Sequence, residues 1–182
     1  AMVPEEFGWK ALLALDGAAL EKQYSASLEA LALKPGMLGV IFKGARCDIH
    51  NPALLKQLIV NLIDKEDWLS LPVDVKGTIY EELLQRSASE STKGAGQYFT
   101  TRAVIRTMVE VMQPGPGVTI CDPACGTGGF LLVAHDYLVE HHKSLDQGQR
   151  RALRFNSLFG WEIVEGAARL GAMNLYLHGI GG

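Results

Sequence analysis

Apolar residues recur at helical spacing through the first part of the chain. A run of spaced leucines predicts helical structure that ends at the Lys-Pro-Gly of residues 34–36. Asn51 and Pro52 supply a predicted N-cap and first helical residue for a second apolar stripe of leucine and isoleucine. Asp74 is expected to cap a third helix. The pattern therefore predicts a helical domain over residues 1–92, whose apolar stripes fit either a core or an interface.

The pattern changes after the small, polar segment 87–96, which is expected to be an exposed linker. Thr100 is expected to cap a helix that ends before the Pro-Gly-Pro-Gly of residues 114–117. Two short β-prone runs follow, and a helical run comes after each of them. This order is typical of an α/β sheet, so residues 93–182 are predicted to be the first part of an α/β domain. The predicted strands are 118–121 and 158–161, and the predicted helices are 130–139 and 167–177.

A glycine turn connects the first predicted strand to the helix after it. Its sequence, from Asp122 to Phe130, is Asp-Pro-Ala-Cys-Gly-Thr-Gly-Gly-Phe. Gly126 and Gly128 would let the backbone turn sharply and approach a ligand closely. The Gly-Lys-Ser/Thr ending of a triphosphate-binding loop is missing, and the third glycine is misplaced for a dinucleotide fingerprint. The segment fits a loop for a ligand without a triphosphate, or an ordinary strand-to-helix turn.

Glu162 ends the second predicted strand. In doubly wound folds a carboxylate at this place binds ribose hydroxyls, whereas an isolated glutamate here is equally well a solvated residue at a helix start. Its pairing with the glycine turn favours the ligand-binding interpretation.

Composition and charge limit the classes of function. The 182 residues include 17 Lys+Arg and 20 Asp+Glu, a formal net charge of −3, which argues against a free-standing DNA-binding domain. With 48% hydrophobic residues the chain is expected to be globular. Three cysteines are too few for a disulfide framework, so a reducing cytoplasm is expected. Cys121 and Cys125 lack a second ligand pair, so no metal site is predicted. No leader sequence or membrane span is expected.

Two ordered motifs carry a family resemblance. The segment Gly94-Ala-Gly-Gln-Tyr-Phe-Thr-Thr-Arg102, followed by the glycine turn, resembles the modification subunit of type I restriction-modification systems. That subunit is an S-adenosylmethionine-dependent DNA adenine-N6 methyltransferase. Further matches lie at residues 76–84, 159–162 and 172–179. The resemblance implies that this chain contains an N-terminal helical domain and the start of a Rossmann-like methyltransferase sheet.

The resemblance also implies a cofactor site for S-adenosylmethionine. The first motif would pack over the methionine end of the cofactor, although Tyr98 and Phe99 alone would be taken for core aromatics. Thr101 stands where proline is usual, which is expected to loosen the Thr100 cap without removing a ligand contact. The glycine turn would supply backbone contacts, and Glu162 would bind the ribose. The implied cofactor-binding residues are Gln97, Tyr98, Phe99, Thr100, Thr101, Arg102, Asp122, Thr127, Gly128, Gly129 and Glu162.

The catalytic loop of the family does not occur in the sequence. Adenine-N6 methyltransferases hold the flipped base with an Asn-Pro-Pro-Tyr/Phe loop, whereas the Asn-Pro here, Asn51-Pro52, precedes the cofactor motifs and is predicted to start a helix. No catalytic residue is therefore predicted. We expect a front fragment of a longer subunit that is inactive alone.

The resemblance implies DNA, a specificity subunit, a restriction subunit and a second modification subunit as partners. Two alternatives remain open. The chain could belong to a solitary adenine-N6 methyltransferase of another restriction type. It could also be a non-catalytic assembly module whose helical domain only contacts partner subunits.

Overall fold

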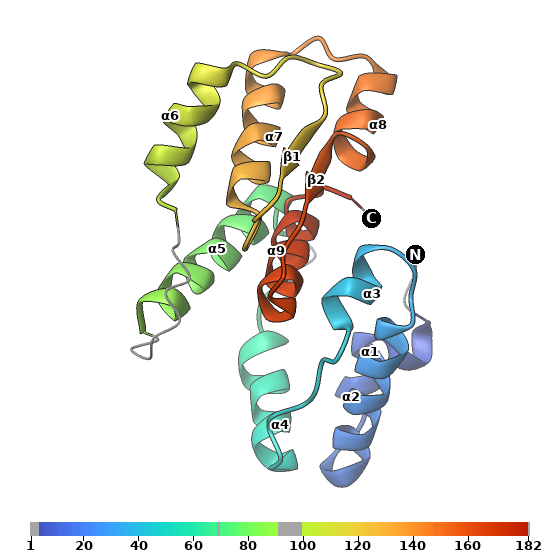
Figure 1. The fold of residues 1–182 in the computed structure, drawn as a ribbon. Helices are drawn as coiled ribbons and strands as arrows, with labels where there is room; N and C mark the ends of the chain where they lie inside the picture. Colours follow the sequence, from blue (N-terminus) through green and yellow to red (C-terminus); the bar gives the residue numbers. More distant parts are fainter. Residues whose placement is uncertain (1–3, 69, 91–99, 182) are drawn as a thin grey trace. The chain divides into compact units, whose positions relative to one another are not determined.

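The computed structural model describes residues 4–68, 70–90 and 100–181 (Figure 1). The chain divides into two compact units, Ala1–Leu71 and Pro72–Gly182. This division precedes the boundary expected at residue 92, because the helix Val73–Glu90 packs within the second unit against the last helix, Glu165–Leu177. The described part is mostly helical, with one small parallel sheet.

The described residues of the first unit form helices and connecting loops, without a strand. Leu12, Leu20, Leu55 and Ile59 form its buried cluster, so part of each of the first two predicted apolar stripes is core. Lys56 holds the elements together, because its ammonium group donates to the carbonyl oxygens of residues 13 and 15, each at 2.8 Å. The elements are η1 (Glu5–Phe7), α1 (Trp9–Leu13), α2 (Gly17–Ala32), α3 (Met37–Phe42), α4 (Pro52–Leu58) and the π-helical segment η2 (Ile59–Ile63).

The predicted start of α4 is confirmed. The side chain of Asn51 accepts hydrogen bonds from the backbone N–H groups of Ala53 and Leu54, and Pro52 is the first helical residue. Proline has no N–H to leave unpaired at this position and its φ angle suits a helix, so the pair defines the helix start.

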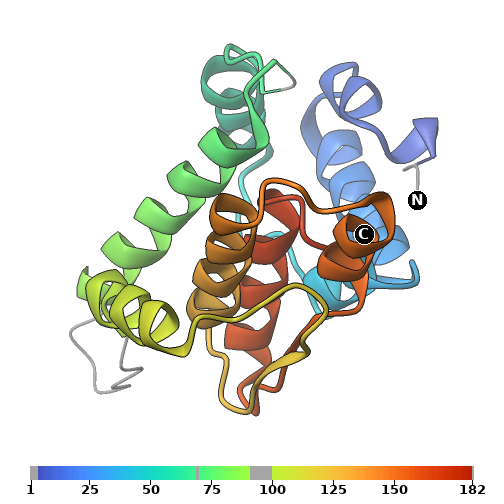
Figure 2. The ribbon, with the colours of Figure 1, turned by 90° about the horizontal axis from the view of Figure 1, so that it is seen from above.

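The second unit contains the sheet. Strands β1 and β2 are parallel, with Ile120 opposite Leu158 and Asp122 opposite Gly160. Helix α6 packs against α7, α5 against α9, and α8 against β2 (Figures 1 and 2). Buried residues of α6 and α7 form the core cluster Ile105, Val109, Val133 and Ala134. The elements are α5 (Val73–Glu90), α6 (Arg102–Met112), β1 (Ile120–Asp122), α7 (Gly129–His141), α8 (Gln147–Phe155), β2 (Leu158–Gly160) and α9 (Glu165–Leu177).

Two predicted helix starts and the predicted linker need correction. Helix α5 already begins at Val73, so Asp74 lies inside its first turn. The helix also continues to Glu90, so residues 87–90 are not a linker; residues 91–99 lie outside the described residues. Helix α6 begins at Arg102, which makes Thr101 the N-cap instead of Thr100. The Thr101 side chain makes no capping hydrogen bond.

Helix α8 was not predicted, because only Leu153 is buried on it and it therefore has no long apolar stripe. Its signal is a capping box. The Asp146 carboxylate accepts from the Gln149 N–H at 2.8 Å, and the Gln149 side chain accepts from the Asp146 N–H at 3.0 Å. The Asp-x-x-Gln spacing in the sequence could have located this helix start.

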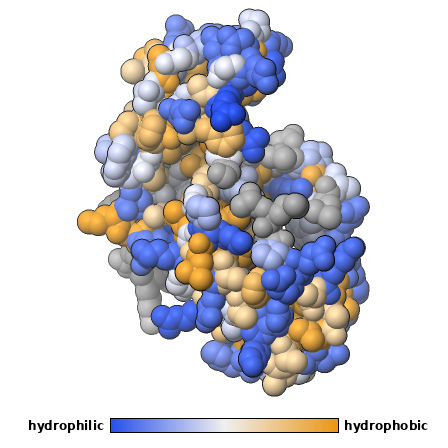
Figure 3. Space-filling model, turned by 90° about the vertical axis from the view of Figure 1, so that its right-hand side faces the viewer, coloured by the Kyte–Doolittle hydropathy of each residue, from blue (hydrophilic) through white to orange (hydrophobic). Residues whose placement is uncertain are grey.

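Hydrophilic and hydrophobic residues are interspersed on the face drawn in Figure 3. Within the described ranges, every helix is too short or too polar to cross a membrane.

Candidate cofactor site

The glycine turn is joined to the chain that follows β2 by two backbone hydrogen bonds. The N–H of Trp161 donates to the carbonyl oxygen of Asp122 at 2.9 Å, and the N–H of Cys125 donates to the carbonyl oxygen of Trp161 at 2.9 Å. These bonds continue the pairing of the two strands into the turn. Gly126 and Gly128 have φ angles of +52° and +81°, a region that favours glycine. The sharp turn expected from the sequence is confirmed.

Glu162 binds the glycine turn directly. Its Oε2 accepts a hydrogen bond from the Gly126 N–H at 2.9 Å, and its Oε1 accepts one from the Val164 N–H at 2.7 Å. The sequence-based pairing of Glu162 with the glycine turn is therefore a physical contact. Each carboxylate oxygen has a second lone pair, which leaves acceptor capacity for a hydroxyl group.

Polar groups of the turn are oriented by local bonds. Oδ1 of Asp122 accepts from the Ala124 N–H at 3.1 Å, an Asx turn that starts the loop. Burial raises the pKa of the Cys125 thiol, and the negative charges of Asp122 and Glu162 raise it further. The thiol is therefore protonated at neutral pH and is a poor metal ligand or nucleophile. Among the residues that the structure describes, no cluster of three possible metal ligands occurs.

Helix α9 supports the turn at close range. A Cβ atom at Gly171 would lie 2.7 Å from the carbonyl oxygen of Gly126, so only glycine allows this approach. One turn along the same face, Nδ2 of Asn174 donates to the carbonyl oxygen of Thr127 at 3.0 Å. Asn174 is 1% exposed. The sequence motif 172–179 contained this residue, but sequence reasoning gave it no role; an asparagine within an apolar helical run is the signal that could have found it.

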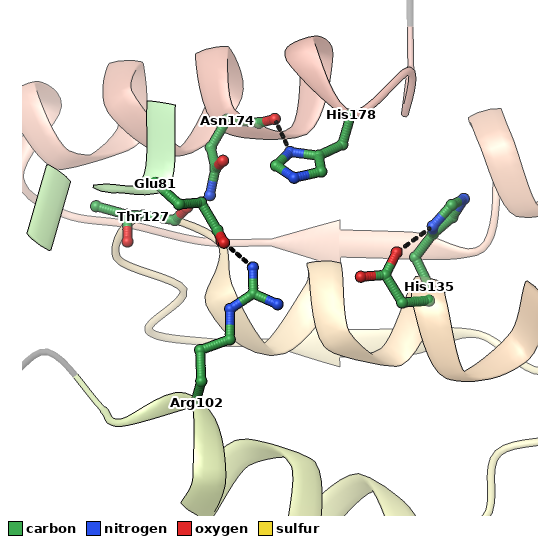
Figure 4. Close-up of polar contacts among 7 residues, drawn as sticks. Glu81, Arg102, Thr127, His135, Asn174 and His178 are labelled. Carbon is green, nitrogen blue, oxygen red and sulfur yellow. Dashed lines mark hydrogen bonds and ion pairs between the residues drawn. The ribbon is translucent and has the colours of Figure 1, made fainter. Parts of the chain in front are cut away.

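An ion pair lies near the glycine turn. Arg102, at the start of α6, pairs with Glu81 of α5 (Figure 4). A small cavity lies beside this pair and extends to Thr127 and Gly129 of the glycine turn. The structure thus brings both Thr100 and Arg102 to the turn. The cavity is lined by Glu81, Leu84, Thr100, Arg102, Ile105, Thr127, Gly129 and Asn174.

The other predicted site residues lie as follows. Thr101 is the N-cap of α6 and does not line this cavity. Gly128 is the N-cap of α7, and a Cβ there would lie 3.4 Å from Leu175 Cγ. Gln97, Tyr98 and Phe99 lie outside the described residues. Glu81 was not predicted, because its partner is 21 residues away in the chain.

A parallel strand pair, a glycine turn and a carboxylate after the second strand define an α/β unit with a candidate small-ligand site. Residues 72–182 match the model of the N-6 DNA Methylase family, and the chain belongs to this family of methyltransferases. The match spans the second unit.

Known proteins agree with this assignment. The chain is 34% identical over 188 residues to the type I restriction enzyme StySPI methylase subunit of Salmonella potsdam, covering 99% of this chain and 35% of that protein. It is 36% identical over 153 residues to the EcoKI methylase subunit of Escherichia coli K12, covering 80% and 29%. The chain therefore spans about a third of the length of these curated relatives.

Solved structures give the same result. A modification subunit from Vibrio vulnificus YJ016 superposes with a TM-score of 0.67 at 29% identity, covering 96% of this chain and 33% of that one. A chain from a study of complex assembly and conformational transition in the type I R-M system gives a TM-score of 0.74 at 27% identity, covering 98% and 38%. The resemblance to type I modification subunits is confirmed.

Proposed function

We propose that this chain supplies the cofactor-binding part of a type I modification subunit. The whole protein would be a site-specific DNA methyltransferase that transfers a methyl group from S-adenosylmethionine to adenine N6. The observation that carries the proposal is the hydrogen bond between Glu162 and Gly126, within the segment that matches the N-6 DNA Methylase family. A carboxylate fixed to a glycine turn is the arrangement that binds a ribose beside a backbone loop.

The residues present fit S-adenosylmethionine. Open space lies on the side of Gly126 where a Cβ would be, so a ligand can approach the backbone. Bound there, the cofactor would supply an electrophilic methyl group. We assign the ribose hydroxyls to Glu162 and the methionine end to the segment Gln97–Arg102. Asp122, Thr127, Gly128 and Gly129 would complete the contacts, and the strand pair would be the start of a Rossmann-like sheet.

Among the proposed cofactor-binding residues, Arg102 is assigned a structural role as well. Its guanidinium is paired with Glu81, so we assign it the additional task of fixing the start of α6 against α5. Arginine has five N–H donors, and the Glu81 carboxylate engages only part of them. The remaining donors can face the ligand.

We propose that binding of DNA and of partner subunits is a property of the whole protein, of which this chain is a part. With a net charge of −3 this chain has little phosphate affinity of its own. We therefore propose that a specificity subunit, a restriction subunit and a second modification subunit act with it on DNA, and that the specificity subunit supplies much of the DNA affinity. The three free cysteines favour a reducing cytoplasm.

Titration calorimetry with S-adenosylmethionine tests the cofactor site, in the protein encoded by the complete gene that contains this sequence. Glu162→Ala should weaken binding at least tenfold, because it removes the proposed ribose acceptor and the bond to Gly126. Glu140→Ala, an exposed carboxylate on α7, is the control and should bind normally. With its specificity subunit, the wild-type protein should transfer labelled methyl groups to adenine N6. Absence of S-adenosylmethionine binding by the wild type would contradict the proposal and favour an assembly module.

A further inference from the structure

The exposed side of helix α8 gathers three arginines and one aromatic ring. The helix packs against β2 (Figure 1) and buries only Leu153. Because an α-helix has 3.6 residues per turn, the side chains that point away from Leu153 share one face. We call this set the arginine face. Its members are all exposed: Arg150, Arg151, Arg154 and Phe155.

The positive charge of the arginine face is not neutralised locally. In the part of the chain that the structure describes, none of its three guanidinium groups forms an ion pair with a carboxylate. Residues 143–161 contain four Lys and Arg residues and one acidic residue, Asp146, whose carboxylate is engaged in the capping box. This stretch therefore carries a charge of +3 within a chain of net charge −3. Such a local excess is the electrostatic footprint of a surface that binds a polyanion.

Hydrogen bonds hold two of the arginines in place. Nε of Arg150 donates to the carbonyl oxygen of Leu145 at 2.9 Å, and Nε of Arg154 donates to the carbonyl oxygen of Gly181 at 3.2 Å. The terminal N–H groups of both guanidinium groups have no partner among the described residues. The side chains are therefore ordered before a ligand arrives, which lowers the entropic cost of binding an anion.

The aromatic ring favours phosphate groups over bases or an apolar protein surface. The guanidinium carbons of Arg151 and Arg154 lie 5.9 and 5.0 Å from the centre of the Phe155 ring, within cation–π range. Because two cations already contact the ring, it orients the arginines and offers little surface for base stacking. A protein partner would need an apolar centre in its interface, and the arginine face contributes no other apolar side chain.

The spacing of the arginines also suits a nucleic acid backbone. Arg150 and Arg154 are four residues apart, so their Cα atoms differ by about 6 Å along the helix axis. The phosphates of one DNA strand follow one another at about 3.4 Å along the duplex axis. Two guanidinium groups of the face can therefore contact nearby phosphates of the same strand.

We propose that the arginine face of α8 binds the phosphate backbone of duplex DNA. This inference rests on the proposed function, because DNA is there the substrate of the whole protein. No residue of α8 lines the cavity beside the glycine turn, so the contact lies outside the candidate cofactor site. Phosphate contacts position a duplex without reading its sequence. The arginine face therefore adds to the DNA affinity that the specificity subunit supplies.

The test measures DNA binding by fluorescence anisotropy over a series of salt concentrations. The protein of the complete gene, in complex with its specificity subunit, is titrated into a labelled duplex of arbitrary sequence. The triple variant Arg150→Gln/Arg151→Gln/Arg154→Gln should lower the affinity roughly tenfold or more at 0.1 M salt. The slope of log K against log salt should become shallower by about 2–3, because each lost phosphate contact removes about 0.9.

Two further variants control for folding and for total charge. Arg151→Gln alone removes no hydrogen bond of the described residues, and it should make the slope shallower by about 1. A matched triple variant removes three exposed charges from the first unit and should keep the wild-type slope: Lys22→Gln/Arg46→Gln/Lys65→Gln.

The outcomes separate this inference from the proposed function. An unchanged salt slope in the arginine variants would overturn the inference, and so would an equal change in the matched triple variant. Loss of the specificity subunit from the arginine variant in gel filtration would show a protein interface and would also overturn it. Calorimetry should show wild-type binding of S-adenosylmethionine by the arginine variant. A wild-type complex that binds no DNA would contradict the proposed function as well.

Discussion

At the scale of single residues, the site depends on how closely helix α9 approaches the glycine turn. Ala167, Gly171 and Asn174 are the buried residues of α9. Gly171 faces the carbonyl oxygen of Gly126, and no side chain lies between them. A glycine inside a helix costs about 1 kcal/mol relative to alanine. The close approach explains why the helix keeps glycine here.

Gly171→Ala should destabilise the protein by about 1–3 kcal/mol, because the new methyl group would press on the backbone of the turn. It should also weaken cofactor binding. Gly166→Ala is the matched control on the same helix, since a Cβ there meets nothing within 4 Å; it should be neutral or stabilising. Urea unfolding of both variants measures the difference. Equal stability of the two alanine variants would contradict the close approach.

Sequence reasoning located the parts of the site whose signal is local. The glycine turn could be predicted because Gly126 and Gly128 need backbone angles that few other residues adopt. Asn174 was not assigned, because its hydrogen-bond partner is 47 residues away in the chain; its only local signal is an asparagine within an apolar helical run. The predicted cap of α6, Thr100, was wrong by one position. Two adjacent threonines are equally suitable caps, so the sequence does not distinguish between them.

At the scale of elements, α5 packs against α9, and the side chain of His178, which follows α9, lies against Gly77 of α5. A Cβ at Gly77 would lie 2.2 Å from His178 Nε2. The imidazole is held in place because its Nδ1 bonds to the carbonyl oxygen of Asn174 at 2.8 Å. Tyr80 of α5 lies against α9 as well, with its hydroxyl 3.5 Å from the carbonyl oxygen of Leu170. Burial raises the pKa of this phenol to about 12.

Gly77→Ala should destabilise the protein by about 1–3 kcal/mol, because the methyl group and the His178 ring would occupy the same space. The double variant Gly77→Ala/His178→Ala should be more stable than the sum of the single changes predicts. A double-mutant cycle in urea gives this coupling. Strictly additive effects on the free energy of unfolding would mean that the His178 ring can move away from residue 77 without destabilising the protein.

Elements with a strong apolar stripe were predictable, and those without one were not. Helices α4 and α7 follow the expected positions closely. The end of α5 was misjudged because the sequence 87–90 is small and polar, and such residues occur in helices as well as in linkers. Helix α8 has a single buried residue, so only its capping box could have located it.

At the scale of the whole molecule, each of the two units has its own buried side chains. Leu20 of α2 and Leu132 of α7 are both 0% exposed and lie in different units. The predicted boundary at residue 92 followed the change in composition. The observed division follows packing, which places α5 with α9.

Leu20→Ala should cost about 2–5 kcal/mol and act mainly on the first unit. Hydrogen exchange should show lost protection in α2 and α4 and unchanged protection in α7. Leu132→Ala is the reciprocal variant and should give the opposite pattern. Equal loss of protection in both units from either variant would contradict separate cores.

The bonds that shape the glycine turn also set the order in which the nascent chain can complete its site. Glu162 is 36 residues beyond Gly126, and Asn174 is 47 residues beyond Thr127. At translation rates of about 5–20 residues per second, the turn waits roughly 2–9 s on the ribosome for its last partner. The first unit, whose described contacts are complete by Leu71, can fold well before then. Newly made protein therefore passes through a state with a folded helical unit and an unfinished site.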